Sequence, residues 1–146
     1  MSMQNISLTG NVHQSVDAMA TGLTTTAEAL GTGIDTTGFR SLLAILAVGA
    51  VTGTNETLDM KLQESSVVGS GYTDITGATF TQVTDTPSPV TDAQFIELDL
   101  LPRKAFIRGL GTIAGTTPVF PTNLIFVLYN AVDSAYAGTA DSTTVT

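Results

Sequence analysis

Apolar and polar residues alternate at every second position in the most regular parts of this sequence. In Thr57–Ser65 the residues from Leu58 to Leu62 follow this pattern, and Gln94–Leu100 repeats it with aliphatic residues set against Glu and Asp. Because successive side chains of a β-strand point to opposite faces, each segment predicts a strand with one buried and one solvent-facing side. No long stretch sustains the 3.6-residue apolar period of a helix. The chain is therefore expected to be all-β.

Two further segments are apolar at almost every position. Phe39–Val51 and Asn123–Tyr129 carry large apolar residues on both faces of the expected strand. Strands of this kind are covered on both sides, so we expect them at the centre of a sheet. Shorter strands are expected at Tyr72–Ile75, Ala78–Val83 and Lys104–Ile113. Turns rich in Gly and Pro separate these segments, and the whole pattern predicts one antiparallel β-sandwich, either jelly-roll-like or immunoglobulin-like.

The length of 146 residues suits a single domain, with the sandwich expected over residues 36–130. Residues 1–35 are rich in Thr, Gly and Ala, so we expect an extended N-terminal arm there. Residues 131–146 are similar in composition and are expected to form a C-terminal tail. Such ends are either disordered or become ordered along a neighbouring subunit on assembly. A short helix over Val16–Leu30, where Ala and Met are locally common, is an alternative for part of the arm.

Charged residues make up only 12% of the chain, against about 25% in typical soluble domains. The surface must then consist mainly of hydroxyl, amide and glycine groups, which lose less hydration on burial than charges do. This composition favours large packed interfaces. The net charge of −8 argues against nucleic-acid binding, since no basic stripe is present to neutralise phosphates. Arg103, Lys104 and Arg108 lie close together, which indicates either a turn with a solvated strand position or a small basic patch for an acidic partner.

Membrane association is not expected. The chain start, MSMQNISLTG, has neither the basic nor the apolar region of an export signal. The longest apolar run, Leu42–Val51, has about ten residues, whereas a membrane-spanning helix needs about 20. This run is better explained as a buried strand.

The residue types needed for catalysis or metal binding are scarce. His13 is the only histidine and there is no cysteine, so neither a histidine cluster nor a thiolate metal site can form. Asp59 and Glu64 fall on opposite faces of one expected strand and do not make a carboxylate pair. The sequence therefore predicts no enzyme, no catalytic residue, no cofactor and no metal site. Carboxylates near turns leave a calcium site as an alternative, although their spacing is not that of an EF-hand. They are Asp74, Asp85 and Asp92.

Carbohydrate binding by a β-sandwich usually relies on exposed aromatic rings, and this chain has few aromatic residues. It contains no Trp, 3 Tyr and 6 Phe. The phenylalanines within expected strands are assigned to the core, and they are Phe39, Phe80, Phe106 and Phe126. The rings expected to be exposed are Tyr72, Tyr129 and Tyr136. Glycan binding is kept as an alternative function.

Three segments resemble small structural proteins of tailed bacteriophages. LDMKLQESSVVGSGYTDITGATFTQV (Leu58–Val83) is similar to their pattern of an L-x-x-K-L-Q-E-S strand, a Gly/Ser turn and Y/W-T-D-I-x-G-A. IDTTGFRSL (Ile34–Leu42) precedes it and FIELDLLPRKAFIRGLGTIAGTTP (Phe95–Pro118) follows it, in the order found in those proteins. The resemblance covers Ile34–Tyr129, roughly two thirds of the chain. After the last strand this chain reads YNAVDSAYAGT, where those proteins often end in a basic, G-H-P-R-H-like segment.

The resemblance implies a non-enzymatic virion protein, and specifically a capsid decoration or cement protein. Such a protein binds the outer surface of the head after assembly in the host cytoplasm, often as a trimer. Its partners would be the major capsid protein and copies of itself, with no nucleic acid and no membrane. We expect the N-terminal arm and the Leu100–Lys104 turn to make the contacts. The alternatives are a tail- or fibre-associated β-sandwich module and a glycan-binding module for host attachment.

Overall fold

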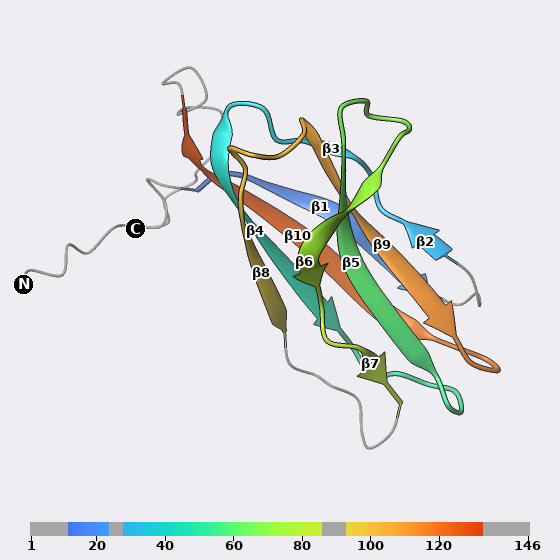
Figure 1. Cartoon of the computed structure of the whole chain (residues 1–146). Helices are drawn as coiled ribbons and strands as arrows, with labels where there is room; N and C mark the ends of the chain where they lie inside the picture. Colours follow the sequence, from blue (N-terminus) through green and yellow to red (C-terminus); the bar gives the residue numbers. More distant parts are fainter. Residues whose placement is uncertain (1–11, 24–27, 86–92, 133–146) are drawn as a thin grey trace, which may run out of the picture.

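The computed structural model describes residues 12–23, 28–85 and 93–132. Their regular structure consists entirely of β-strands, which form two facing sheets (Figure 1). The strands are β1 (Val12–Leu23), β2 (Glu28–Leu30), β3 (Ile34–Asp35), β4 (Phe39–Val48), β5 (Thr57–Ser65), β6 (Thr73–Thr79), β7 (Val83–Thr84), β8 (Gln94–Asp99), β9 (Phe106–Ala114) and β10 (Phe120–Ala131). The predicted all-β antiparallel sandwich is confirmed.

The order of the strands identifies the type of sandwich. One sheet, sheet A, has the order β1-β10-β4-β8. In the other, sheet B, β2 and β3 both pair with β9, which pairs with β5, and β5 pairs with β6 and β7. Early strands thus pair with late ones: β1 with β10, β2 and β3 with β9, and β4 with β8. This arrangement, a long hairpin rolled into two sheets, is the jelly roll, the first of the two expected architectures.

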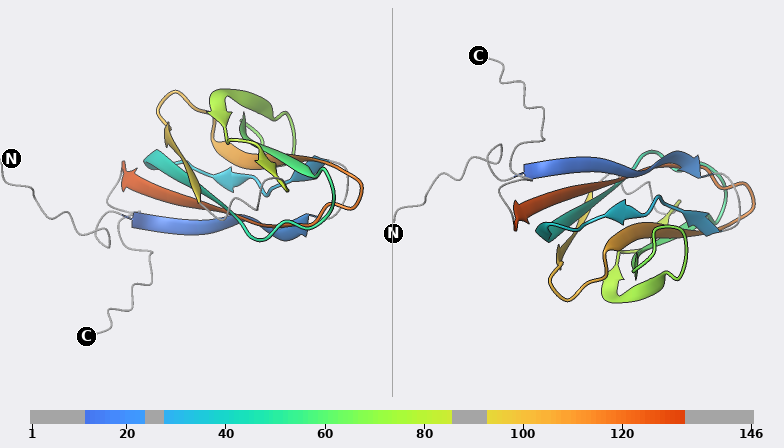
Figure 2. Two further views of the ribbon diagram at one scale, coloured as in Figure 1. Left: turned by 90° about the horizontal axis from the view of Figure 1, so that it is seen from below. Right: turned by 90° about the horizontal axis from the view of Figure 1, so that it is seen from above.

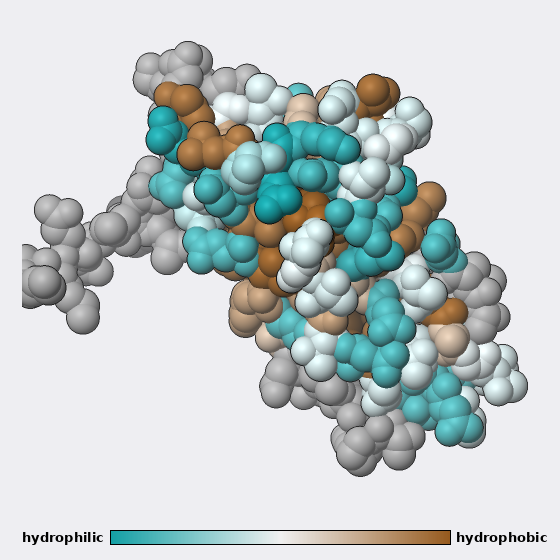
Figure 3. All heavy atoms as spheres, viewed as in Figure 1, coloured by the Kyte–Doolittle hydropathy of each residue, from teal (hydrophilic) through white to brown (hydrophobic). Residues whose placement is uncertain are grey.

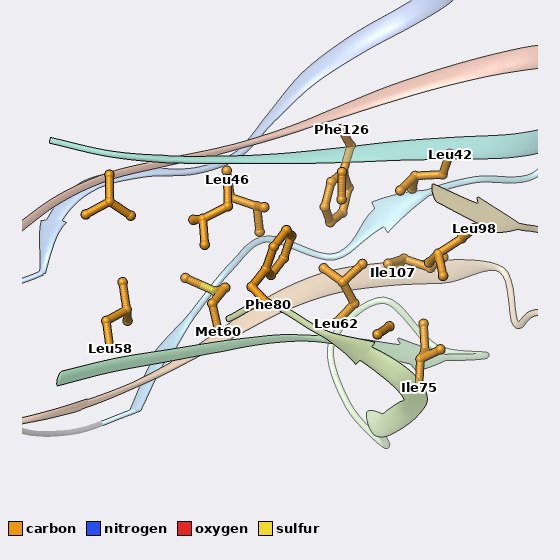
Figure 4. Close-up of a cluster of buried hydrophobic side chains, with 14 of the residues drawn as sticks. Leu42, Leu46, Leu58, Met60, Leu62, Ile75, Phe80, Leu98, Ile107 and Phe126 are labelled. Atoms are coloured by element: carbon orange, nitrogen blue, oxygen red, sulfur yellow. The ribbon is translucent and has the colours of Figure 1, made fainter. Parts of the chain in front are cut away.

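The core lies between the inner faces of the two sheets (Figure 4). Leu42, Leu46 and Phe126 point from sheet A toward Met60 and Leu62 of sheet B, and all five are at most 1% exposed. The remaining buried residues continue this layer along the sandwich. They are Leu23, Phe39, Ala44, Val48, Leu58, Ile75, Ala78, Phe80, Val83, Leu98, Leu100, Ile107, Ile113, Phe120, Leu124 and Leu128.

A glycine allows the two sheets to approach closely at one point of this core. A Cβ atom on Gly109 of β9 would lie 2.3 Å from Cδ2 of Leu124 on β10. The missing side chain therefore makes room for a leucine from the opposite sheet.

The alternating segments and the central strands are predicted well. β5 has the expected bounds, and β4 and β10 are the two interior strands of sheet A, as their two-sided apolar pattern predicts. The prediction of two separate strands around Gly77 is wrong, because β6 runs through this residue. Between the pairs Gln63↔Asp74 and Lys61↔Thr79, β6 contains more residues than β5, so Gly77, with φ of +81°, lies in a bulge.

The expected N-terminal arm is wrong for the described part of residues 1–35. β1 pairs with β10 from Val12, opposite Tyr129, to Leu23, opposite Phe120. The sandwich therefore begins before residue 36, and most of the alternative helix over Val16–Leu30 is strand. An edge strand is held mainly by backbone hydrogen bonds to its one neighbour. A Thr- and Gly-rich segment can therefore form an edge strand without the apolar pattern of a central strand. Residues 1–11 and the tail from residue 133 lie outside the described residues.

The inner face of β10 provides a first test of this packing. Phe126→Ala is expected to lower the free energy of unfolding by about 3–5 kcal/mol, because it removes a fully buried ring and leaves a cavity. Asn123→Ala, at an exposed position of the same strand, should change it by less than about 0.5 kcal/mol. Urea unfolding followed by circular dichroism measures both. Equal losses would show that β10 does not place Phe126 between the sheets.

Candidate interaction surface

The outer side of sheet A carries a group of apolar side chains, here called the apolar face: Leu43, Ile45, Phe95, Ile125 and Val127. Across the sheet, Ile125 pairs with Ile45, and Ile45 pairs with Phe95. On the next row of the same face, Val127 pairs with Leu43. Directly opposed residues of a sheet share one face, so these rows form one continuous apolar patch.

The apolar face is separate from the core. Along β4 and β10 the buried residues alternate with Leu43, Ile45, Ile125 and Val127, which are partly exposed. Phe95 is 62% exposed. In the two views of Figure 2, sheet A forms an outer layer, and no described element covers the side that faces away from sheet B. Monomeric soluble proteins rarely expose large apolar patches, so this face is a candidate interface.

The outer side of sheet B is different, because a polar network covers it. Arg108 of β9 donates two hydrogen bonds to Oε1 of Gln63, at 3.1 and 2.9 Å, and lies 3.9 Å from the centre of the Tyr72 ring. Gln63 in turn donates to Asp74, which also pairs with Lys61 at 2.7 Å. The hydrogen bond from Lys61, followed by that from Gln63, lowers the pKa of Asp74. Figure 3 shows this side as largely hydrophilic.

The predicted basic group lies at one end of this network and contacts its own chain. Arg103 lies 3.9 Å from Glu64, and Lys104 donates through Nζ to Thr73 and through its backbone N–H to Glu64. Together with Arg108 on Gln63, each of the three residues has an intramolecular partner. The arrangement matches the turn-and-strand interpretation, and it provides no uncompensated basic patch.

A buried carboxylate joins the loops at the opposite end of the sandwich. Glu56 is fully buried, and its Oε1 accepts hydrogen bonds from the backbone N–H groups of Thr54 at 2.8 Å and Thr117 at 3.0 Å. Its own N–H donates to Asp85, whose other carboxylate oxygen accepts from Asn55. The β4–β5 loop, the segment after β7 and the β9–β10 loop are thus held by two carboxylates.

The second oxygen of Glu56 has no hydrogen-bond partner and is packed against Gly115. A Cβ atom on Gly115 would lie 1.5 Å from this oxygen, and the φ of Gly115 is +133°. The glycine therefore permits both the loop conformation and the close approach of the carboxylate. With the oxygen packed this tightly against backbone, the contact serves the loops and offers no space for a ligand.

Exposed apolar residues also occur at the end of sheet A opposite Glu56. Leu101, in the turn after β8, is 68% exposed, and Val132, just after β10, is 55% exposed. The rows of the sheet bring these elements together, because Val12 pairs with Tyr129, Tyr129 with Ser41, and Ser41 with Asp99. The Leu100–Lys104 turn therefore lies at the same end of the sheet as the start of β1.

The described carboxylates considered for catalysis, Asp59 and Glu64, contact different parts of the chain. Asp59 accepts a hydrogen bond from Gln82, while Glu64 contacts the turn before β9. Among the described residues, no three His, Asp or Glu side chains are placed to hold a metal ion. The side chain of His13 is not described, and Asp92 and Tyr136 lie outside the described residues.

The aromatic assignments are partly confirmed. Phe39, Phe80 and Phe126 are buried, whereas Phe106 is only partly buried. Tyr72 and Tyr129 are partly buried rather than exposed rings. The structure also reveals the exposed ring of Phe95 and the buried carboxylate of Glu56. The sequence analysis assigned no face to Phe95, although the alternation of Gln94–Leu100 gives it the same parity as Glu97 and Asp99. Nothing local marks Glu56.

Comparison of this sequence with protein-family models and with curated proteins found no match. In the part of the chain that the structure describes, no helix is long and apolar enough to cross a membrane.

The role of Glu56 can be tested by substitution. Glu56→Ala is expected to lower the free energy of unfolding by about 3 kcal/mol, because the Thr54 and Thr117 N–H groups lose their acceptor. Glu56→Gln keeps an oxygen acceptor and should lose about 1 kcal/mol. Denaturant unfolding compares the two variants. A glutamine variant as unstable as the alanine variant would show that the carboxylate charge, and not its acceptor oxygen, holds the loops.

Tyr129, on the outer side of sheet A, should make the stability of the folded chain depend on pH. Burial raises the pKa of Tyr129 above its ordinary value of 10.0, and the hydrogen bond to Glu97 raises it further. The neutral phenol is thus favoured in the folded state, and its stabilisation is present below pH 10.0 and lost as the pH rises through the raised pKa. Above pH 10.0, Tyr129→Phe should therefore lose less stability than the parent chain, as measured by urea unfolding across alkaline pH. Parallel pH curves would contradict this role.

Proposed function

We propose that this chain is a non-enzymatic structural protein of a bacteriophage virion, most specifically a capsid decoration or cement protein. It binds the outer surface of the head and stabilises the shell through contacts with the major capsid protein and with copies of itself. The uncovered apolar face of sheet A carries the proposal that the chain works by assembly. The bacteriophage setting rests on the resemblance of Ile34–Tyr129 to small virion proteins.

Two properties of the structure support an assembly role. The described surface combines a low charge density with apolar groups on one sheet, so an interface can form with few charges to desolvate. Jelly rolls also occur in viral capsid and lectin domains, although a fold alone does not define a function. The partial burial of Tyr72 and Tyr129 leaves few exposed rings for a glycan site among the described residues.

The turn after β8 is proposed as the contact with the head. Leu101 is the most exposed of the large apolar side chains in the described residues, and Pro102 next to it is also exposed. Asp99 accepts a hydrogen bond from the N–H of Leu101, at 3.0 Å, which helps to fix the turn. A fixed turn with an exposed apolar tip can insert into a pocket at little entropic cost. Repetition over a symmetric shell then multiplies a weak contact.

The proposal is tested with heads that were assembled without this chain. Purified chain is mixed with such heads, and the bound amount is measured by co-sedimentation relative to the major shell protein. A near-equal ratio is expected for a decoration protein. A handful of copies per particle would instead support a tail or vertex component, and no binding would contradict the proposed function.

A substitution at the turn tests the proposed contact. Leu101→Asp should weaken binding to heads about tenfold or more, since it places a charge in an apolar contact. Thr79→Asp serves as the matched control, because Thr79 is exposed on sheet B opposite Lys61 and an acidic residue is tolerated there. Circular dichroism confirms that both variants fold. Equal binding by both variants would place the contact elsewhere.

A further inference from the structure

We infer that the apolar face of sheet A is an interface between two copies of this chain, which pack sheet to sheet. This inference goes beyond attachment to a head, because it assigns a defined surface to self-association. It depends only on the chain itself, so it can be correct whether or not the chain binds a virion.

The centre of the face is suited to contact with its own copy. On the outward positions of the two central strands, Ser41 to Ala47 in β4 and Asn123 to Tyr129 in β10, no residue is charged. The rows Ile125–Ile45–Phe95 and Val127–Leu43 cross this region. The central strands of two such surfaces can meet without burying a charge, which keeps the desolvation cost there low. The nearest acidic residues lie on the edge strands, where Asp17 pairs with Ile125 and Glu97 pairs with Leu43.

The acidic residues beside the face do not require a basic partner. Glu97 of β8 accepts a hydrogen bond from the Tyr129 hydroxyl, and Asp99 accepts one from the N–H of Leu101. Four of the five Lys and Arg residues are used elsewhere, in the polar network of sheet B and the turn that joins it. A partner for the apolar face therefore needs apolar and hydroxyl groups and no basic ones. The same face of a second copy has this composition.

The whole outer side of sheet A, with the apolar face at its centre, has about the size of a standard interface. Sheet A has four strands, and β4 has ten residues, so its outer face measures about 19 Å by 33 Å at ordinary strand spacing and rise. This footprint of roughly 600 Å² is close to the roughly 800 Å² of accessible surface that each partner buries in a standard interface. Accessible surface exceeds the flat footprint, so one sheet face is sufficient.

A two-fold arrangement keeps the two β8 strands apart. A two-fold axis that runs along the strands, between β10 and β4, would place β8 of one copy over β1 of the other. Glu97 and Asp99 of the two copies would then lie at opposite sides of the interface, each beside β1 of the other copy, where Asp17 pairs with Ile125. The strands of the two copies would also run nearly parallel to each other, which is the alignment that stacked sheets prefer.

Sedimentation equilibrium of the purified full chain tests this inference. We expect the parent chain to form dimers at roughly 10 to 100 µM, the range of a weak but specific interface. Ile45→Lys, at the centre of the apolar face, should weaken the dimer at least 100-fold. Thr112→Lys is the matched control, because Thr112 is exposed on a central strand of sheet B between Asp59 and Glu28.

The outcomes separate this inference from the proposed function. A parent chain that stays monomeric throughout this range, or a folded Ile45→Lys variant that dimerises normally, would overturn the inference. If Ile45→Lys fails to fold, Phe95→Ser replaces it, since Phe95 is already 62% exposed. Loss of dimers by the Thr112→Lys control would also overturn it, because the interface would then not be sheet A. Dimers that fail to bind heads would remove the virion role and leave the inference intact.

Discussion

The contact between the inner faces of sheets A and B is the interaction on which the rest of this structure depends. Leu42, Leu46 and Phe126 from one sheet meet Met60 and Leu62 from the other, and together they are almost completely excluded from water. A sheet with one apolar side must bury that side against another element, and in this chain each sheet buries the apolar side of the other. The two central strands of sheet A are separated in sequence by about half of the chain, so this contact forms only when distant segments have folded back on each other.

The loops at the two ends of the sandwich differ in chemistry: one end is held by internal hydrogen bonds, and the other exposes an apolar side chain. At one end, Glu56 and Asp85 accept backbone hydrogen bonds and hold the loops together. At the other end, the turn with Leu101 leaves an apolar side chain in solvent next to the start of β1 and the end of β10. Polar groups that are satisfied inside the chain stabilise a loop, whereas exposed apolar groups gain free energy only when something covers them.

The sequence predicted the parts of the fold that obey a local rule. Strict alternation in Thr57–Ser65 located β5 with its correct bounds, and two-sided apolar composition placed β4 and β10 at the centre of a sheet. β1 escaped prediction because the partner that stabilises it, β10, lies about a hundred residues away. Glu56 was missed for the same reason: its second hydrogen-bond donor, Thr117, is 61 residues distant. An acidic residue in a loop has no local signature that distinguishes a buried acceptor from a solvated charge.

The two-sided apolar pattern of β4 and β10 is not explained by their central position in the sheet alone. In sheets covered by helices, such strands are buried on both faces because helices pack on each side. The described part of this chain has no helix, and sheet B covers only the inner side. Polar residues on the outer positions would satisfy the fold equally well, as the network of Lys61, Gln63, Asp74 and Arg108 does on sheet B. Within the described residues nothing covers the outer side of Leu43, Ile45, Ile125 and Val127, and the second copy that we propose would provide the cover that their strands lack.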